Sequence, residues 1–171
     1  LGEEHPSTAA SLNNLAELYR RQERYEEAEA LYQQALAIWR KQLGGEHPYV
    51  ANCLNNLAGL YLQQCRYQEA EEFFKLAIST YERLVGENHP NTHNSRAGLE
   101  LCQQLSLELS EAEQAVAEAL GNPAIDREKL VQQLEELAQS AESGEEAGSP
   151  WRLLAGRLRE LATKLQAGSG A

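Results

Sequence analysis

Hydrophobic and polar positions along the first half of the chain repeat every 42 residues. The segment LGEEHP at residues 1–6 returns as LGGEHP at residues 43–48 and as VGENHP at residues 85–90. LNNLA at residues 12–16 returns unchanged at residues 54–58. A period of this length is typical of proteins in which each repeat is one supersecondary unit. We therefore expect an array of stacked repeats.

Within each repeat, the pattern predicts two antiparallel helices. In the first helix, apolar side chains recur on one helical face, at residues 12, 15, 16 and 19. Pro6 suits the first helical position and places His5 at the N-cap. The turn at residues 22–24 is short enough to make the second helix run back. Gly44 and Gly45 follow that helix and are expected to form a left-handed C-terminal cap.

Residues 85–122 keep the register of the repeat but lose part of its pattern. Ser110 and Glu113 have the spacing of a capping box and are expected to open a second helix. Where the first two repeats have an apolar, a small and an aromatic residue, this segment has Arg96, Glu100 and Gln103, respectively. Because stacked repeats need a terminal unit with a polar outer face, we interpret this segment as that unit.

Two further helices are predicted after the period ends at Pro123. Their apolar stripes are residues 130, 134, 137 and 141, and then residues 151, 154, 158, 161 and 165. Ser149 and Pro150 are the expected N-cap and first residue of the second helix. We favour a helical hairpin that covers the open end of the array. The alternative is an exposed heptad-like seam through which the hairpin weakly self-associates.

The repeat resembles the tetratricopeptide repeat (TPR). Residues 12, 15, 16 and 19, with Ala28, Tyr32 and Ala35 in the second helix, match its pattern. The 42-residue step resembles the long variety in kinesin light chains and bacterial TPR proteins. The resemblance implies an all-α fold, a right-handed superhelix of helix-turn-helix repeats, which we expect to end in the C-terminal helical hairpin cap. Its parts are repeat 1 at residues 1–42, repeat 2 at 43–84, a degenerate repeat 3 at 85–122, and the capping hairpin with a flexible tail at 123–171.

Composition limits the classes of partner. The 171 residues carry a net charge of −11, which argues against nucleic acid or an anionic membrane as the main partner. No apolar run approaches about 18 residues, so no membrane span is expected. Three cysteines without a CxxC motif indicate reduced thiols in a cytoplasmic protein. The absence of Met indicates a piece of a longer protein.

No catalytic or cofactor-binding motif is present in the sequence, and we expect neither an enzyme nor a bound cofactor. His5, His47 and His89 each precede a proline once per repeat, which is a requirement of the turn. His89 and His93 have a chelating spacing, but no third ligand is evident, so we expect no metal site.

The resemblance implies a concave groove that is lined by the first helix of each repeat and holds a short extended peptide. A protein or peptide is therefore the expected partner. The groove positions would be Ala10, Asn13, Asn14, Glu17 and Arg21 in repeat 1, Asn52, Asn55, Asn56, Gly59, Leu62 and Gln63 in repeat 2, and Asn94, Gly98, Leu101 and Leu105 in repeat 3.

Asparagine carries both a donor and an acceptor, and it costs stability in the middle of a helix. We favour Asn14 and Asn56 over Asn13 and Asn55 as backbone-binding residues, since the family places an asparagine at the position of Asn14 and Asn56. The alternative is that these amides bond the neighbouring repeat. Gly59 and Gly98 would leave room for the peptide. Arg21 would bind an acidic group or pair with Glu17 on its own helix.

The sequence thus predicts a non-catalytic protein-interaction module that binds a peptide or partner domain in its concave groove. One alternative is a structural or self-associating segment of a longer array. Another is a regulatory domain of a larger effector protein. The sequence does not identify the partner.

Overall fold

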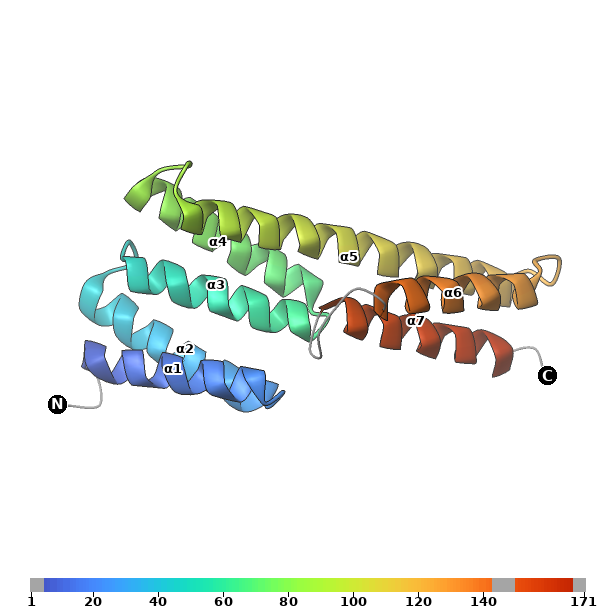
Figure 1. The fold of residues 1–171 in the computed structure, drawn as a ribbon, viewed down its shortest axis with the longest axis horizontal. Helices are drawn as coiled ribbons and strands as arrows, with labels where there is room; N and C mark the ends of the chain where they lie inside the picture. Colours follow the sequence, from blue (N-terminus) through green and yellow to red (C-terminus); the bar gives the residue numbers. More distant parts are fainter. Residues whose placement is uncertain (1–4, 143–149, 168–171) are drawn as a thin grey trace. The chain divides into compact units, whose positions relative to one another are not determined.

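The computed structural model describes residues 5–142 and 150–167. This part of the chain is helical, without strands. The helices are α1 (Pro6–Arg21), α2 (Tyr25–Leu43), α3 (Pro48–Gln63), α4 (Tyr67–Val85), α5 (Pro90–Gly121), α6 (Arg127–Glu142) and α7 (Pro150–Ala167) (Figure 1). Two compact units share the chain, an N-terminal unit at residues 1–103 and a C-terminal unit at residues 104–171. The expected all-α fold is confirmed.

The first two repeats begin and turn as the sequence predicts. Each first helix starts at a proline, and the preceding histidine caps it. Nδ1 of His5 accepts a hydrogen bond from the backbone N–H of Ser7 at 3.1 Å. The same bond joins His47 and Tyr49 at 3.2 Å. The caps satisfy N–H groups that a helix start leaves without partners, which explains the recurring His-Pro pair.

The turn between paired helices depends on an arginine and a tyrosine. The Arg24 guanidinium lies 3.9 Å from the centre of the Tyr19 ring, and Arg66 lies 4.2 Å from the ring of Tyr61. The middle turn residues, Glu23 and Cys65, adopt positive φ angles of 60° and 57°. A side chain with a Cβ adopts this conformation at a cost, and the sequence offered no glycine or asparagine to signal it.

The C-terminal caps of α2 and α4 differ from the prediction. Gly44 has φ 86° and ψ 167°, and Gly86 has φ 89° and ψ 165°. Positive φ is confirmed, but these ψ values lie far outside the left-handed helical region, and Gly45 has no positive φ. The chain leaves the helix in an extended direction because it must reach the next first helix.

We expect Gly44→Ala to destabilise the protein by about 1 kcal/mol, because alanine resists the φ that this exit requires. Gly45→Ala is the matched control, since a Cβ there meets nothing within 4 Å and the backbone is unstrained. Thermal unfolding of both variants tests this. Equal melting temperatures would contradict it.

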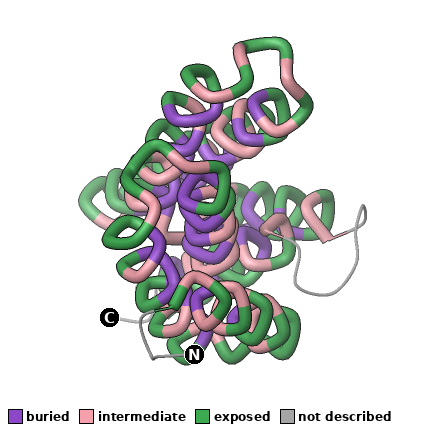
Figure 2. The backbone as a smooth tube through the Cα atoms, turned by 90° about the vertical axis from the view of Figure 1, so that its left-hand side faces the viewer, coloured by how far each residue is buried: buried purple, intermediate pink, exposed green. Residues whose placement is uncertain are grey.

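Small side chains fill the contacts between helices of the N-terminal unit. Ala16, Ala28 and Ala35 are fully buried, as is Tyr32. The longest buried stretches belong to α3, which packs against α1, α2 and α4 (Figures 1 and 2). Helix α3, which has neighbouring helices on both sides, therefore contributes more buried residues to this core than any other helix of the unit.

The predicted helical break at Ser110 is wrong, because α5 continues through it from Pro90 to Gly121. The turns after α1 and α3 have an arginine that stacks on a tyrosine. The equivalent positions in the third unit are Glu108 and Gln103, so the pair is missing. Because this segment has neither the arginine–tyrosine contact nor a Gly or Pro to interrupt the helix, continuing the helix is more favourable than forming a turn.

The C-terminal unit contains the end of α5 and the α6/α7 hairpin (Figure 1). Arg127 donates to the carbonyl of Ala119 at 3.0 Å, which satisfies the end of α5. The hairpin is confirmed, whereas its role as a cap stays a prediction. The exposed-seam interpretation is wrong for Leu154, Leu158 and Leu165, because all three are buried. The expected N-cap at residue 149 lies outside the described residues.

Candidate functional site

Asparagines from three consecutive first helices gather around one polar hollow in the N-terminal unit. Its volume is about 260 Å³. We call it the asparagine hollow and define it by its lining residues, which are Asn13 of α1, Asn52, Asn55 and Asn56 of α3, Tyr81 of α4, and Asn91 and Asn94 of α5. The 42-residue period places them together, because equivalent helix faces stack. Five of these asparagines are among the residues predicted from the sequence.

Hydrogen bonds across the repeats hold several of these amides in place. Nδ2 of Asn56 donates to Oδ1 of Asn13 at 3.2 Å and links α3 to α1. The Ser95 hydroxyl of α5 donates to Oδ1 of Asn55 at 2.7 Å. The Tyr81 hydroxyl donates to Oδ1 of Asn52. The alternative in which these amides bond neighbouring repeats is therefore correct for Asn13, Asn55 and Asn56.

Each of these amides has a second group that the repeats do not use. The Oδ1 atoms of Asn13, Asn52 and Asn55 each accept a hydrogen bond, whereas their Nδ2 groups form none among the described residues. Asn94 and Asn91 have no side-chain hydrogen bond in that same part of the chain. The hollow is thus rich in N–H donors, which suit the carbonyl oxygens of a peptide backbone.

Three predicted groove residues belong to a separate cluster outside the hollow. Glu17 accepts hydrogen bonds from Arg20, Arg21 and the Tyr32 hydroxyl, all at 2.9 Å. Arg20 also donates to Oε1 of Gln63 at 2.9 Å and joins the first repeat to the second. Arg21 pairs with Glu17, which is the second of the two roles expected for it.

The charge of Glu17 is stabilised by this cluster. Burial acts to raise the pKa of its carboxyl, but the hydrogen bonds from Arg20, Arg21 and Tyr32 outweigh burial and lower that pKa to about 2. The carboxylate is therefore fully ionised at neutral pH and is engaged within the protein. We assign Glu17 and Gln63 to the structural link that Arg20 makes between the repeats, whereas Arg21 pairs with Glu17 on its own helix.

The remaining predicted residues lie in different surroundings. Asn14 is exposed and outside the hollow, and Leu101 is half-buried on α5. Gly59 has open space where a side chain would be. Leu62 is wrong as a groove residue, because α3 has helices on both sides and the leucine is only 5% exposed. Gly98 does not leave room for a ligand, because the ring of Phe74 fills that space.

Sequence reasoning missed two residues of the hollow and one link of the cluster around Glu17. Tyr81 lies at the end of a second helix, where the pattern placed no groove residue, and its equivalent in repeat 1 is Trp39. Asn91 follows the His-Pro turn, at the position that Tyr49 occupies in repeat 2. The Arg20 link spans 43 residues, so only tertiary contact reveals it.

Other chemistry is limited in the part of the chain that the structure describes. His, Cys, Asp and Glu form no group there that could hold a metal ion. The thiols of Cys53 and Cys102 are buried, and burial raises their pKa to about 12 and about 11. Each donates to a backbone carbonyl, that of Tyr32 at 3.3 Å or of Tyr67 at 3.1 Å. Such thiols are unreactive.

Among the residues that the structure describes, no helix is both long enough and apolar enough to cross a bilayer.

Comparisons with known proteins agree with this architecture. The family model described as tetratricopeptide repeat matches residues 7–83 and residues 60–122. A comparison with curated proteins gave no significant match.

Among solved structures, the fold is similar to that of BtubC (BKLC) from P. vanneervenii, with a TM-score of 0.57 and 23% identity over 98% of this chain and 67% of that chain. A putative kinesin light chain from Podosopora anserina with nearly identical TPR-like repeats is 27% identical, with a TM-score of 0.55 over 99% of this chain and 80% of that one. A variant of that protein is also 27% identical, with a TM-score of 0.56, over 99% and 79% of the two chains. The family matches cover more than half of the sequence, and the chain therefore belongs to the tetratricopeptide repeat family and is similar to kinesin light chains.

Proposed function

We propose that the chain binds a protein partner by holding a peptide backbone in the asparagine hollow. Tetratricopeptide repeats are generally protein-interaction modules and are typically non-catalytic. One observation carries the proposal: six asparagines from three first helices line a single hollow. Side-chain amides bind the N–H and C=O groups of a peptide whatever its side chains are.

The hollow favours backbone recognition over recognition of charge, because none of its lining residues is charged. Its volume of about 260 Å³ is slightly below that of a drug-sized pocket, so it accommodates a short stretch of peptide. We expect an affinity in the micromolar range, about −8 kcal/mol. None of the three cysteines forms a disulfide in the described part of the chain, which suits a reducing compartment, and we propose the cytoplasm.

A matched pair of asparagines tests the proposal. Asn94 and Asn14 are both exposed on first helices, and neither side chain has a hydrogen bond within the described ranges. Only Asn94 lines the hollow. For a peptide selected on the immobilised chain from a random display library, Asn94→Ala is expected to weaken binding about tenfold, or about 1.4 kcal/mol. Asn14→Ala is expected to change the affinity less than about twofold.

Circular dichroism checks that both variants keep their helices. Failure to enrich any peptide would contradict the proposal, and so would equal loss of affinity in the two variants. In either case the hollow would have only a structural function.

A further inference from the structure

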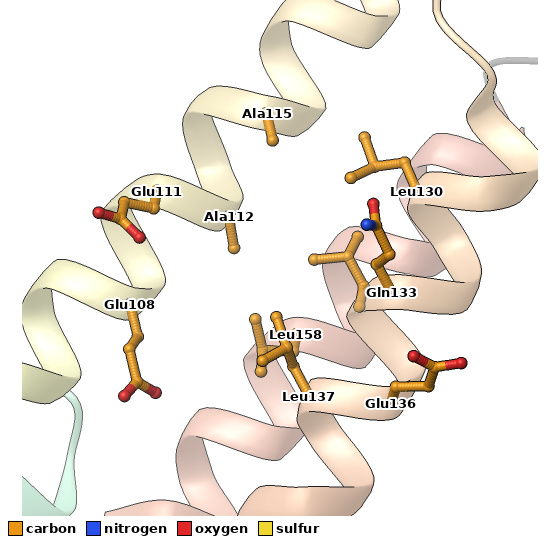
Figure 3. A pocket seen from close by; sticks show the side chains of 10 residues that line it. Glu108, Glu111, Ala112, Ala115, Leu130, Gln133, Glu136, Leu137 and Leu158 are labelled. Atoms are coloured by element: carbon orange, nitrogen blue, oxygen red, sulfur yellow. The ribbon is translucent and has the colours of Figure 1, made fainter.

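A second candidate binding surface lies in the C-terminal unit, on residues that the asparagine hollow does not use. A groove of about 550 Å³ separates the end of α5 from the α6/α7 hairpin (Figure 3). Its volume is within the range of about 300–1,000 Å³ that is usual for ligand sites. We call it the acidic-rimmed groove, lined by Glu108, Glu111, Ala112 and Ala115 of α5, by Leu130, Gln133, Leu134, Glu136 and Leu137 of α6, and by Leu158 of α7.

Both walls of the groove are single helix faces of the same length. Residues 108, 111, 112 and 115 line α5, and residues 130, 133, 134 and 137 line α6. Each set has the i, i+3, i+4, i+7 spacing of one face over two turns, or about 10 Å. Two parallel walls of this kind accept the apolar face of another helix.

Apolar side chains form the centre of the groove. Ala112 and Ala115 face Leu130 and Leu137 across the opening, and the small alanines leave the space between them (Figure 3). Leu137 is 52% exposed, which is unusual for a leucine on a hairpin whose other leucines are largely buried. Covering it would remove apolar surface from water.

The rim of the groove is acidic and has no compensating charge. Glu108, Glu111 and Glu136 line it, whereas none of the lining residues is Lys or Arg. Glu108 and Glu136 accept hydrogen bonds from the neutral amides of Gln104 and Gln132. None of the three glutamates forms an ion pair within the described part of the chain. Positive side chains at the edge of an occupant would complement this rim.

We propose that the acidic-rimmed groove binds a basic amphipathic helix of a partner protein. An extended peptide is disfavoured, because the groove walls are helices whose backbone groups are already bonded, and only Gln133 offers an uncharged polar side chain. A helix satisfies its own backbone and needs only an apolar face and flanking Lys or Arg. A second copy of this chain is disfavoured by its net charge of −11.

Fluorescence anisotropy with two labelled peptides tests the proposal on the full chain. Both are amidated peptides of about 14 residues with leucines on one helical face. One has Lys and Arg on its other face, and the second has Glu there. We expect the basic peptide to bind at least about tenfold more tightly than the acidic one. No binding of the basic peptide, or equal binding of both, would overturn the proposal.

Matched substitutions locate the bound peptide. Leu137→Gln is expected to weaken binding at least about tenfold, whereas Leu107→Gln, at a 60% exposed leucine outside the groove, should have less than about a twofold effect. Glu111→Gln with Glu136→Gln is expected to weaken binding about fivefold. Glu118→Gln with Glu128→Gln removes the same charge elsewhere and should leave the affinity unchanged.

Two results would overturn the assignment to this groove. Equal effects of the groove and control substitutions would indicate nonspecific attraction to an acidic surface. A dimer in sedimentation velocity that Leu137→Gln dissociates would assign the groove to a second copy of the chain.

Discussion

Replacing Gly98 by leucine is expected to destabilise the protein by about 2–3 kcal/mol. A Cβ at this position of α5 would lie 2.5 Å from both Cε1 and Cζ of Phe74 on α4. The Phe74 ring is rigid and only 4% exposed, so it cannot move away without disturbing its neighbours. Replacing a glycine in a helix by leucine gains about 1 kcal/mol in helix propensity, and we expect the cost of overpacking to exceed this gain. Urea unfolding followed by circular dichroism measures the loss.

Gly59 provides the matched control for this substitution. It also lies in a first helix, but a Cβ there would meet nothing within 4 Å. Gly59→Leu is therefore expected to be neutral or to stabilise the protein by up to about 1 kcal/mol. Adding Phe74→Leu should recover part of the loss in Gly98→Leu, since the two residues are in contact. Equal stability of the two glycine variants would refute the steric explanation.

Replacing Glu17 by glutamine is expected to reduce stability by about 2 kcal/mol near neutral pH. The carboxylate joins Arg20, Arg21 and the Tyr32 hydroxyl, and Arg20 links this cluster to repeat 2 through Gln63. The side chain is 28% exposed, so solvent screens part of the interaction and the cost stays below that of a fully buried pair. Glu27→Gln removes an exposed carboxylate that bonds only Arg24, and it should leave stability nearly unchanged.

The contribution of Glu17 is expected to depend on pH. Its pKa is about 2 in the folded protein, below its ordinary value of 4.5. A lowered pKa stabilises the folded state above the unfolded pKa, and this stabilisation is lost as the pH falls from about 4.5 toward about 2. The stability difference between the parent and Glu17→Gln should therefore shrink by about 1 kcal/mol between about pH 6 and about pH 3.5. A difference that is constant with pH would contradict the charged role of Glu17.

The exact 42-residue repetition determined most of the fold. Helix starts at the His-Pro pairs, the short turns and the small residues at helix crossings all follow from local spacing. The sequence also indicated five asparagines of the hollow, because residues at equivalent positions of stacked repeats face the same side. The family resemblance rested on the same residues and is confirmed.

Tertiary contacts decided which residues of the groove face inward. Asn13 and Asn14 are adjacent in the sequence, yet only Asn13 lines the hollow, and Leu62 is buried although the pattern placed it in the groove. A helix turns 100° per residue, so small differences in how helices pack decide which of two adjacent residues lines the hollow. The packing of the helices also places Tyr81, from the second helix of repeat 2, against the hollow.

The end of the repeat array likewise depended on interactions that span the chain. The capping-box sequence at Ser110 predicted a break in the helix. A cap contributes only about 1 kcal/mol, which does not end a helix where the interactions that stabilise a turn are missing. The sequence by itself determined the repeat, the helix starts and the family. The partners of each side chain, and with them the hollow, the glutamate cluster and the acidic-rimmed groove, were decided only by packing between residues distant in sequence.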